Sequence, residues 1–304
     1  MLSYIFEYNW YLINDPVKFN RFLYESYTFL SVVEWFSWDQ LQHTTENPTD
    51  QHGIIDFPSF MQGRLVTLNG SVVSRCDEQD CIDECNLLLQ AYTLPFAPNN
   101  RLDGYNRLIF RHHTTPSIKY FVDAKIHKIP KFEKTLHIHR KRDFEIQMRC
   151  ENPFIYSLEE FVETFDETNG IRDYGLPWNL PTPIIPTFTI SLTNSGTYDA
   201  FLRLKINGPF QSVKIINETT GRYQQFYGVN CLAGDYIAID SRTGYAFKND
   251  DPAQQLDPFI INDSSWITLA PGANTLKFQF TTLNNLWWRP TVEVWYRSMF
   301  LAIP

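Results

Sequence analysis

The sequence has few cysteines, no long apolar run and no excess of positive charge. Its 304 residues include 5 cysteines, an odd number. No segment has about 18 consecutive apolar residues, and residues 1–7 lack the basic start of a signal peptide. We therefore expect a soluble chain made in the cytosol, without membrane insertion, whose cysteines are free buried thiols.

The motifs of the common enzyme classes are missing as well. The chain has no Gly-x-Ser-x-Gly elbow, no Gly-x-x-x-x-Gly-Lys phosphate loop and no His-Glu-x-x-His pair. Its formal net charge of −8 argues against a general nucleic-acid binder, because phosphate binding needs clustered Lys and Arg. We expect a protein that is not an enzyme, needs no cofactor or metal, and binds no nucleic acid sequence-specifically.

Aromatic residues, in contrast, are abundant. They make up 16% of the chain and include 8 tryptophans, while the hydrophobic fraction of 43% is that of an ordinary globular protein. Aromatic side chains favour strands and interfaces, and they crowd residues 1–60 without a clean period. This opening is expected to be folded and to form contacts. A length of 304 residues favours two domains over one large β-domain.

The first half of the chain shows strand patterns from residue 64 onwards. Apolar residues of one parity occupy 64–72, with Asn69-Gly70 marking a turn or a bulge, and the alternation recurs over 118–126 and 136–148. The last segment crosses the basic residues 140–142. It therefore predicts either one long strand or a hairpin with a basic tip.

One helix interrupts this pattern. Residues 77–80 carry three acids, which favour the first turn of a helix. An apolar set on one face follows at spacings of three and four: Ile82, Cys85, Leu88, Leu89 and Tyr92. We predict an amphipathic helix over residues 77–91.

A proline-rich stretch divides the chain. Residues 176–186 contain four prolines, which remove backbone donors and disfavour helix. Short strands separated by turn residues follow, around residues 188–192, 201–206, 213–215, 236–239, 245–247, 276–280 and 292–296. We predict a mainly β fold with one helix. An α+β domain would span 1–175, a junction 176–186, and an antiparallel β-sandwich of the jelly-roll type 187–304.

Two groups of residues have the chemistry of metal ligands. The first combines thiols and imidazoles: Cys76, Cys81, Cys85, His112 and His113. Its spacing lacks a paired Cys-x2-Cys hook, and the helix face already explains Cys85. The second, His137 and His139, shares one face of a strand, where a solvated polar surface is the simpler interpretation. We expect no metal at either place.

Acidic and aromatic clusters supply the remaining candidates. The acidic run over residues 159–167 is interpreted as a solvated segment, because a glycosidase needs two carboxylates facing each other across a cleft. Trp287, Trp288 and Trp295 offer aromatic faces that suit a sugar ring or a partner protein. Adjacent tryptophans on a strand point to opposite faces, and core packing is the simpler role for them.

The second half resembles the C-terminal domain of siphophage distal tail proteins. Four segments carry the resemblance in order: Ile206–Pro209, Val213–Gly221, Leu232–Asp240 and Trp266–Phe278. These segments form the turns and strands of a sandwich and contain no catalytic group. The first half is more loosely similar to the ring domain of that family, over residues 64–72, 77–91, 120–126 and 144–156.

This resemblance implies a structural virion protein at the tail tip, part of the baseplate hub. The N-terminal domain would assemble into a six-membered ring that joins the tail tube protein to the tip hub protein, around a channel for DNA. The C-terminal galectin-like domain would hold receptor-binding proteins or touch host-surface sugars. A closed ring needs extensive apolar interfaces, for which the aromatic opening is the candidate.

Two alternatives stand beside this expectation. In the first, the C-terminal sandwich is the working part of a carbohydrate-binding protein that recognises host cell-surface glycans. In the second, the chain is a cell-wall-degrading hydrolase whose carboxylates the sequence does not pair.

Overall fold

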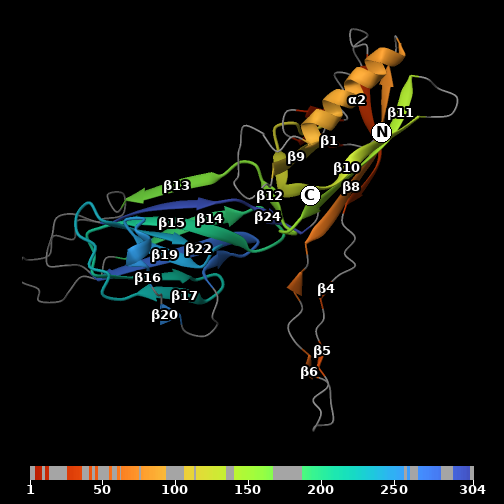
Figure 1. Ribbon diagram of the computed structural model, residues 1–304. Helices are drawn as coiled ribbons and strands as arrows, with labels where there is room; N and C mark the ends of the chain where they lie inside the picture. Colours follow the sequence, from red (N-terminus) through yellow and green to blue (C-terminus); the bar gives the residue numbers. More distant parts are fainter. Residues whose placement is uncertain are drawn as a thin grey trace, which may run out of the picture. The chain divides into compact units, whose positions relative to one another are not determined.

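The chain folds into two compact units, residues 1–158 and 159–304 (Figure 1). The computed structural model describes residues 4–8, 11–13, 26–35, 41–42, 45–46, 55–56, 60–61, 63–74, 77–93, 106–112, 114–134, 140–166, 187–256, 259–260, 266–281 and 290–301. Both units are built on antiparallel sheets, which confirms the predicted mainly β fold.

The N-terminal unit contains an antiparallel sheet with the order β2-β1-β9-β10-β11-β8-β3. Its strands are β1 (Tyr4–Tyr8), β2 (Tyr11–Ile13), β3 (Ser26–Trp35), β8 (Arg64–Ser74), β9 (Asn106–His112), β10 (Lys119–Lys134) and β11 (Lys141–Cys150). The short strand β12 (Ile155–Ser157) pairs with β10. Strands β10 and β11 pair antiparallel and form a hairpin, but its first strand ends at Lys134, and Lys141 and Arg142, expected at a basic tip, already belong to β11. The tip residues 135–139 lie outside the described ranges.

The expected alternation in β8 and β11 is confirmed. Val66 and Leu68 are fully buried, and so are Met148 and Ile146, which lie directly opposite them on the neighbouring strand. Side chains that face each other across strands share one side of the sheet, so these pairs form a continuous apolar layer.

Asn69-Gly70 does not turn the chain, because β8 runs straight through it. The irregularity lies on the neighbouring strand β3, where the register shifts between Leu30 and Val32, opposite Gly70 and Asn69. The shift inserts one extra residue in β3 and displaces the register of the strand by one position.

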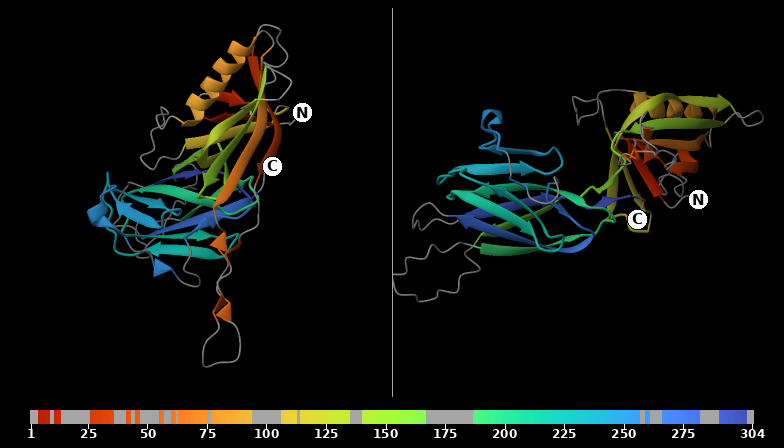
Figure 2. Two further views of the ribbon diagram at one scale, coloured as in Figure 1. Left: turned by 45° about the vertical axis from the view of Figure 1, so that its right-hand side comes forward. Right: turned by 90° about the horizontal axis from the view of Figure 1, so that it is seen from below.

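The predicted helix is present as α2 (Glu78–Thr93), the one α-helix among the described residues. Asp77 caps its first turn, because its carboxylate accepts a hydrogen bond of 2.8 Å from the backbone N–H of Asp80. Its buried face centres on Cys81, Cys85 and Leu88 and packs against β8 and β10. Figures 1 and 2 show α2 along one face of the sheet.

Part of the aromatic opening belongs to the core of this unit. Phe6 and Tyr8 on β1 are buried, and the Tyr8 ring stacks on the Tyr92 ring of α2 at 4.8 Å between centroids. Phe6 lies 6.0 Å from Phe110 of β9. These aromatics therefore stabilise the domain itself.

The segment between β3 and β8 contains two further strand pairs. They are β4 (Leu41–Gln42) with β7 (Phe60–Met61), and β5 (Thr45–Glu46) with β6 (Ile55–Asp56). Together with the pairing of β3 and β8, they form a nested antiparallel series, as in a long hairpin (Figure 1). We call residues 41–61 the hairpin extension.

The C-terminal unit is a two-sheet antiparallel sandwich, as predicted. One sheet has the order β13-β23-β15-β18-β19, with β21 also on β15, and the other has the order β14-β22-β16-β17-β20. The first contains β13 (Phe161–Asp166), β15 (Ala200–Asn207), β18 (Tyr236–Asp240), β19 (Tyr245–Lys248), β21 (Thr268–Leu269) and β23 (Thr291–Tyr296). The second contains β14 (Thr187–Asn194), β16 (Ser212–Asn217), β17 (Arg222–Phe226), β20 (Phe259–Ile260) and β22 (Gly272–Thr281). The 3-10 turn η2 (Pro252–Gln254) follows β19, and β24 (Met299–Phe300) follows β23.

Alternating apolar side chains from both sheets fill the sandwich core. Leu204 and Val294 come from the first sheet, and Ile215 and Phe278 from the second; all are buried. Phe188 of β14 stacks on Phe278 of β22 at 5.1 Å. The alternation read from the sequence therefore sets both the inner and the outer face of each sheet.

The chain enters this sandwich earlier than expected. Strand β13 begins at Phe161, inside the acidic run that was expected to be a solvated segment of the first domain, and pairs with β23. Phe161 stacks on Tyr296 at 5.1 Å, while Val162 and Glu163 are exposed. Apolar residues lie on both sides of this short edge strand, so no clear alternation marked it among the charged residues. The expected junction 176–186 lies outside the described residues.

Candidate functional site

The outer face of the sheet β13-β23-β15-β18-β19 carries a row of large and charged side chains. Trp295 lies opposite Arg203, Arg203 opposite Asp240, and Asp240 opposite Tyr245. Residues opposite each other on paired strands project to the same face, so these four side chains form one line across β23, β15, β18 and β19. Strand alternation aims them outward, because their neighbours Val294, Leu204, Ile239 and Ala246 are buried.

A second row lies next to the first. It consists of Glu293, Lys205, Ala238 and Phe247, again in direct register. Ala238 is the smallest side chain in the two rows, and its neighbours are long. The methyl group therefore leaves a hollow in the face.

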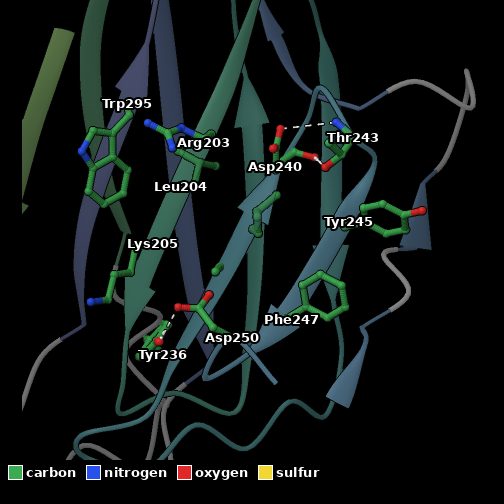
Figure 3. Close-up of a pocket in the computed structure, with 12 residues that line it drawn as sticks. Arg203, Leu204, Lys205, Tyr236, Asp240, Thr243, Tyr245, Phe247, Asp250 and Trp295 are labelled. Carbon is green, nitrogen blue, oxygen red and sulfur yellow. Dashed lines mark hydrogen bonds between the residues drawn. The ribbon is translucent and has the colours of Figure 1, made fainter. Parts of the chain in front are cut away.

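This hollow is a pocket of about 550 Å³, within the range of ligand sites of about 300–1,000 Å³. Its walls are Arg203, Leu204, Lys205, Tyr236, Ala238, Ile239, Asp240, Thr243, Tyr245, Phe247, Asp250 and Trp295. Figure 3 shows Trp295 at one end and Tyr245 at the other, with Arg203 and Asp240 between them. We call this pocket the outer groove.

Hydrogen bonds hold two carboxylates of the outer groove in place. Asp240 accepts hydrogen bonds from the backbone N–H groups of Arg242 (2.8 Å) and Thr243 (3.3 Å), both through Oδ1. Asp250 accepts a bond of 2.6 Å from the hydroxyl of Tyr236 (Figure 3). This contact raises the pKa of Tyr236, so the phenol stays protonated and donates to Asp250.

The two cations of the groove are also oriented. The Lys205 ammonium lies 4.4 Å from the centre of the Tyr236 ring, a cation–π contact. Arg203 pairs through Nη2 with Glu160 at 2.6 Å, and Arg297 lies 3.7 Å from the same carboxylate. The Arg203 side chain remains 55% exposed, and its bond to Glu160 uses only one nitrogen of the guanidinium.

A rigid turn supports one end of the groove. Asp235 begins the turn into β18 and accepts bonds from the Asn249 amide (2.9 Å), the Leu232 backbone N–H (3.1 Å) and the Lys248 ammonium (3.0 Å). These partners lower the pKa of Asp235 to about 2. The start of β18 is thereby fixed to the end of β19, where the backbone N–H of Tyr236 also donates to the Asn249 side chain at 2.9 Å.

The chemistry of the outer groove is that of binding. Its aromatic faces offer apolar surface, and its carboxylates and cations offer acceptors and donors at fixed positions. Asp240 and Asp250 both accept hydrogen bonds from other residues of the groove wall or its turn. The arrangement suits a ligand with hydroxyl groups and an apolar ring face.

Of the three predicted tryptophan contacts, the structure places one in this groove. Trp295 lines it and is partly exposed, so it projects away from the core that its neighbours Val294 and Tyr296 fill. Trp287 and Trp288 lie outside the described residues. Arg203, Asp240 and Tyr245 were missed; their outward parity in recognised strands was the signal that pointed to them.

The structure describes three of the cysteine and histidine candidates, Cys81, Cys85 and His112. Cys81 and Cys85 are buried on α2, and burial raises the pKa of Cys85 to about 12. Cys76, His113, His137 and His139 lie outside the described ranges. Within those ranges, no three His, Cys, Asp or Glu side chains gather closely enough to hold a metal ion.

The other two described thiols are buried as well. Burial raises the pKa of Cys150 to about 12 and that of Cys231 to about 11. Thiols in such surroundings stay protonated and are poor nucleophiles. Among the described residues, no helix has the length and apolar character needed to cross a bilayer.

Comparison with known proteins gives a structural match over the whole chain. No family model and no curated protein matches the sequence. The crystal structure of the SPP1 Dit (gp 19.1) protein, described as a paradigm of the hub adsorption apparatus in phages that infect Gram-positive bacteria, superposes with a TM-score of 0.57 at 12% identity. The match covers 99% of this chain and 100% of the SPP1 protein.

Two chains from the activated baseplate of phage p2 also align. The structure with Sr covers 97% of each chain at 8% identity with a TM-score of 0.35, and the structure with Ca covers 100% of each at 9% with a TM-score of 0.34. These scores are too low to bear on the fold. The SPP1 match shows that the chain has the fold of a siphophage distal tail protein, as the sequence resemblance implied.

Proposed function

We propose that this chain is a structural protein of the tail tip of a long-tailed phage, without enzymatic activity. The observation that carries the proposal is the match to SPP1 Dit, which extends over both units and nearly every residue of both chains. A shared single domain would leave the role open, whereas the same two domains in the same order support the same kind of assembly.

In this proposal the N-terminal unit forms a six-membered ring. The ring joins the tail tube protein on one side to the tip hub protein on the other, and DNA passes through its channel without sequence-specific contacts. The C-terminal sandwich carries host-adsorption proteins. Cyclic rings use head-to-tail interfaces, in which two different surfaces of each subunit meet.

The sheet of the N-terminal unit offers a surface for such an interface. Strand β3 closes one end of the strand order, and its ten residues present a backbone edge that pairs only with β8 among the described strands. An edge strand of this length favours pairing with another chain. The hairpin extension continues from β3 and contains several apolar residues, among them Leu41, Ile55 and Phe60.

A two-stranded hairpin is marginally stable by itself in water, so the hairpin extension needs a partner surface. We propose that it packs on the neighbouring subunit of the ring. Deleting residues 1–50 does not test this idea, because β1 and β3 are part of the sheet and Phe6 and Tyr8 are part of its core. Removing only the extension leaves these elements in place.

The experiment images the purified full chain by negative-stain electron microscopy. The wild type is expected to show closed rings with a central hole. A variant in which a short Gly-Ser turn replaces residues 38–61 is expected to keep the N-terminal fold, reported by its melting transition, and to lose the rings. Dispersed single particles of the wild type at every concentration would contradict the ring, and intact rings of the variant would contradict the role of the extension.

A further inference from the structure

We propose that the outer groove binds an uncharged oligosaccharide. The inference rests on the proposed function only for its setting, adsorption to a host surface. Its physical basis is the groove itself, which combines two aromatic ends, a central pair of opposite charges and a hollow left by the small side chain of Ala238.

The length of the groove favours more than one sugar ring. Trp295 and Tyr245 lie at the two ends of a row that crosses four neighbouring strands. Three inter-strand spacings separate them, about 14 Å along the sheet. One pyranose covers only part of this length, so one ring stacking near each end accounts for both aromatics (Figure 3).

The aromatic side chains present the surface that such stacking needs. Tyr245 is 50% exposed, and its ring lies 5.8 Å from the Phe247 ring in a stacked arrangement. Trp295 is partly exposed on a strand whose inward residues already fill the core. The C–H face of a pyranose is apolar and packs on aromatic rings of this kind.

The middle of the row supplies hydrogen bonds for hydroxyl groups. The backbone bonds of Asp240 use Oδ1, so Oδ2 keeps its acceptor capacity. Arg203 donates a hydrogen bond through Nη2 to Glu160. A guanidinium has five N–H donors in a fixed fork. An acceptor and a donor side by side match two neighbouring hydroxyls of a sugar.

The charge of the groove favours a neutral ligand. Its walls contain two cations, Arg203 and Lys205, and two carboxylates, Asp240 and Asp250. Glu160 is already paired with Arg203, and Glu293 lies opposite Lys205 in the register. An anionic polymer would meet as many carboxylates as cations, which leaves no net attraction for phosphate or uronate groups.

The groove is formed before any ligand arrives. Tyr236 is held by Asp250 and covered by Lys205, and the turn at Asp240 fixes its carboxylate. A site whose side chains are already ordered loses little entropy on binding.

The experiment uses the full-length chain with neutral and anionic probes. Maltotriose, cellotriose, chitotriose and galactotriose represent uncharged saccharides, and a glycerol-phosphate oligomer and a hyaluronan oligomer represent anionic ones. They are first screened on an array of glycans that includes them. Binding is then titrated by tryptophan fluorescence and calorimetry.

Three variants locate the site. Tyr245→Ala removes one stacking face and is expected to weaken binding about tenfold. Ala238→Trp fills the hollow on the outer face, where the core is not disturbed, and is expected to abolish binding. Tyr227→Ala is the matched control, because Tyr227 is 61% exposed but does not line the groove.

The expected result is saturable binding of at least one neutral saccharide that both groove variants weaken and the control does not. The inference is overturned if no neutral saccharide on the array binds saturably, if the groove variants bind like the wild type, or if only anionic probes bind. A protein segment seated in the groove of assembled particles would overturn it as well. Ring formation is measured without saccharide, so either result can fail while the other stands.

Discussion

Replacing Asn217 with alanine tests how the two sheets of the C-terminal sandwich are joined. Asn217 is fully buried at the end of β16 and makes four hydrogen bonds. Its Nδ2 donates to the Thr268 carbonyl at 2.8 Å and to Asn274 Oδ1 at 3.3 Å. Its Oδ1 accepts from the backbone N–H groups of Thr219 at 3.0 Å and Thr220 at 3.3 Å.

The expected cost follows from which of these partners water can reach. Thr219 is exposed and Thr220 partly exposed, so their N–H groups turn to solvent when the amide is gone. The Thr268 carbonyl lies on β21 of the opposite sheet, at a residue that is 8% exposed, and a buried acceptor left unsatisfied costs about 1–3 kcal/mol. With the lost turn contacts, the free energy of unfolding of this domain should fall by about 2–4 kcal/mol.

Differential scanning calorimetry of the full chain measures this loss. The melting temperature of the C-terminal transition should drop by roughly 6–15 °C, while the N-terminal transition stays unchanged. Asn207→Ala is the matched control, because its amide bonds to Thr291 (2.9 Å) and Glu293 (3.3 Å) on the partly exposed outer face. Equal melting shifts for the two variants, or a shift of less than about 2 °C for Asn217→Ala, would refute the reasoning.

Three further predictions concern stability and reactivity. Asp235 has its pKa lowered to about 2, so its contribution to stability is complete above about pH 4 and is lost as the pH falls towards 2; Asp235→Asn should flatten the pH dependence of the melting temperature in this window. Leu88→Ala should lower the free energy of unfolding of the N-terminal domain by about 2–5 kcal/mol in urea, because Leu88 is fully buried, whereas Leu87→Ala, at 41% exposure, should change it by less than about 0.5 kcal/mol. Cys85 and Cys150, with pKa values raised to about 12, should resist iodoacetamide at pH 8 until denaturant is added, and mass mapping of fast native modification would contradict their burial.

The sequence predicted those elements whose two faces differ clearly. In β8, β11, β15 and β22 apolar residues alternate with polar ones, and the helix carries a clear period of three and four with acids at its start. Local patterns of this kind depend on which side of an element is buried, which the sequence records directly.

The strands that the sequence did not predict lack a clear alternation of apolar and polar residues. In β3 a bulge between Leu30 and Val32 shifts the parity half-way along the strand. In β17 one of the inward side chains is Gln224, which is polar although it is 1% exposed. In β13 the outer face carries Val162, so apolar residues lie on both sides.

The outer groove could not be predicted from the sequence for a different reason. Its members lie between Arg203 and Trp295, and only the register of four strands brings them into line. The hollow depends on the small side chain of Ala238 among long neighbours, a feature of the assembled sheet. Trp295 was singled out as a candidate, but its partners could not be paired with it.

The central claim, that the chain builds a ring at a phage tail tip, is tested most directly by its mass in solution. Six copies of the 35.8 kDa chain make a particle of about 215 kDa, because a closed cyclic assembly has a fixed stoichiometry. Size-exclusion chromatography with multi-angle light scattering should show this species, and it should give way to a monomer when residues 38–61 are replaced. A single species of 35.8 kDa at every protein concentration would contradict the claim.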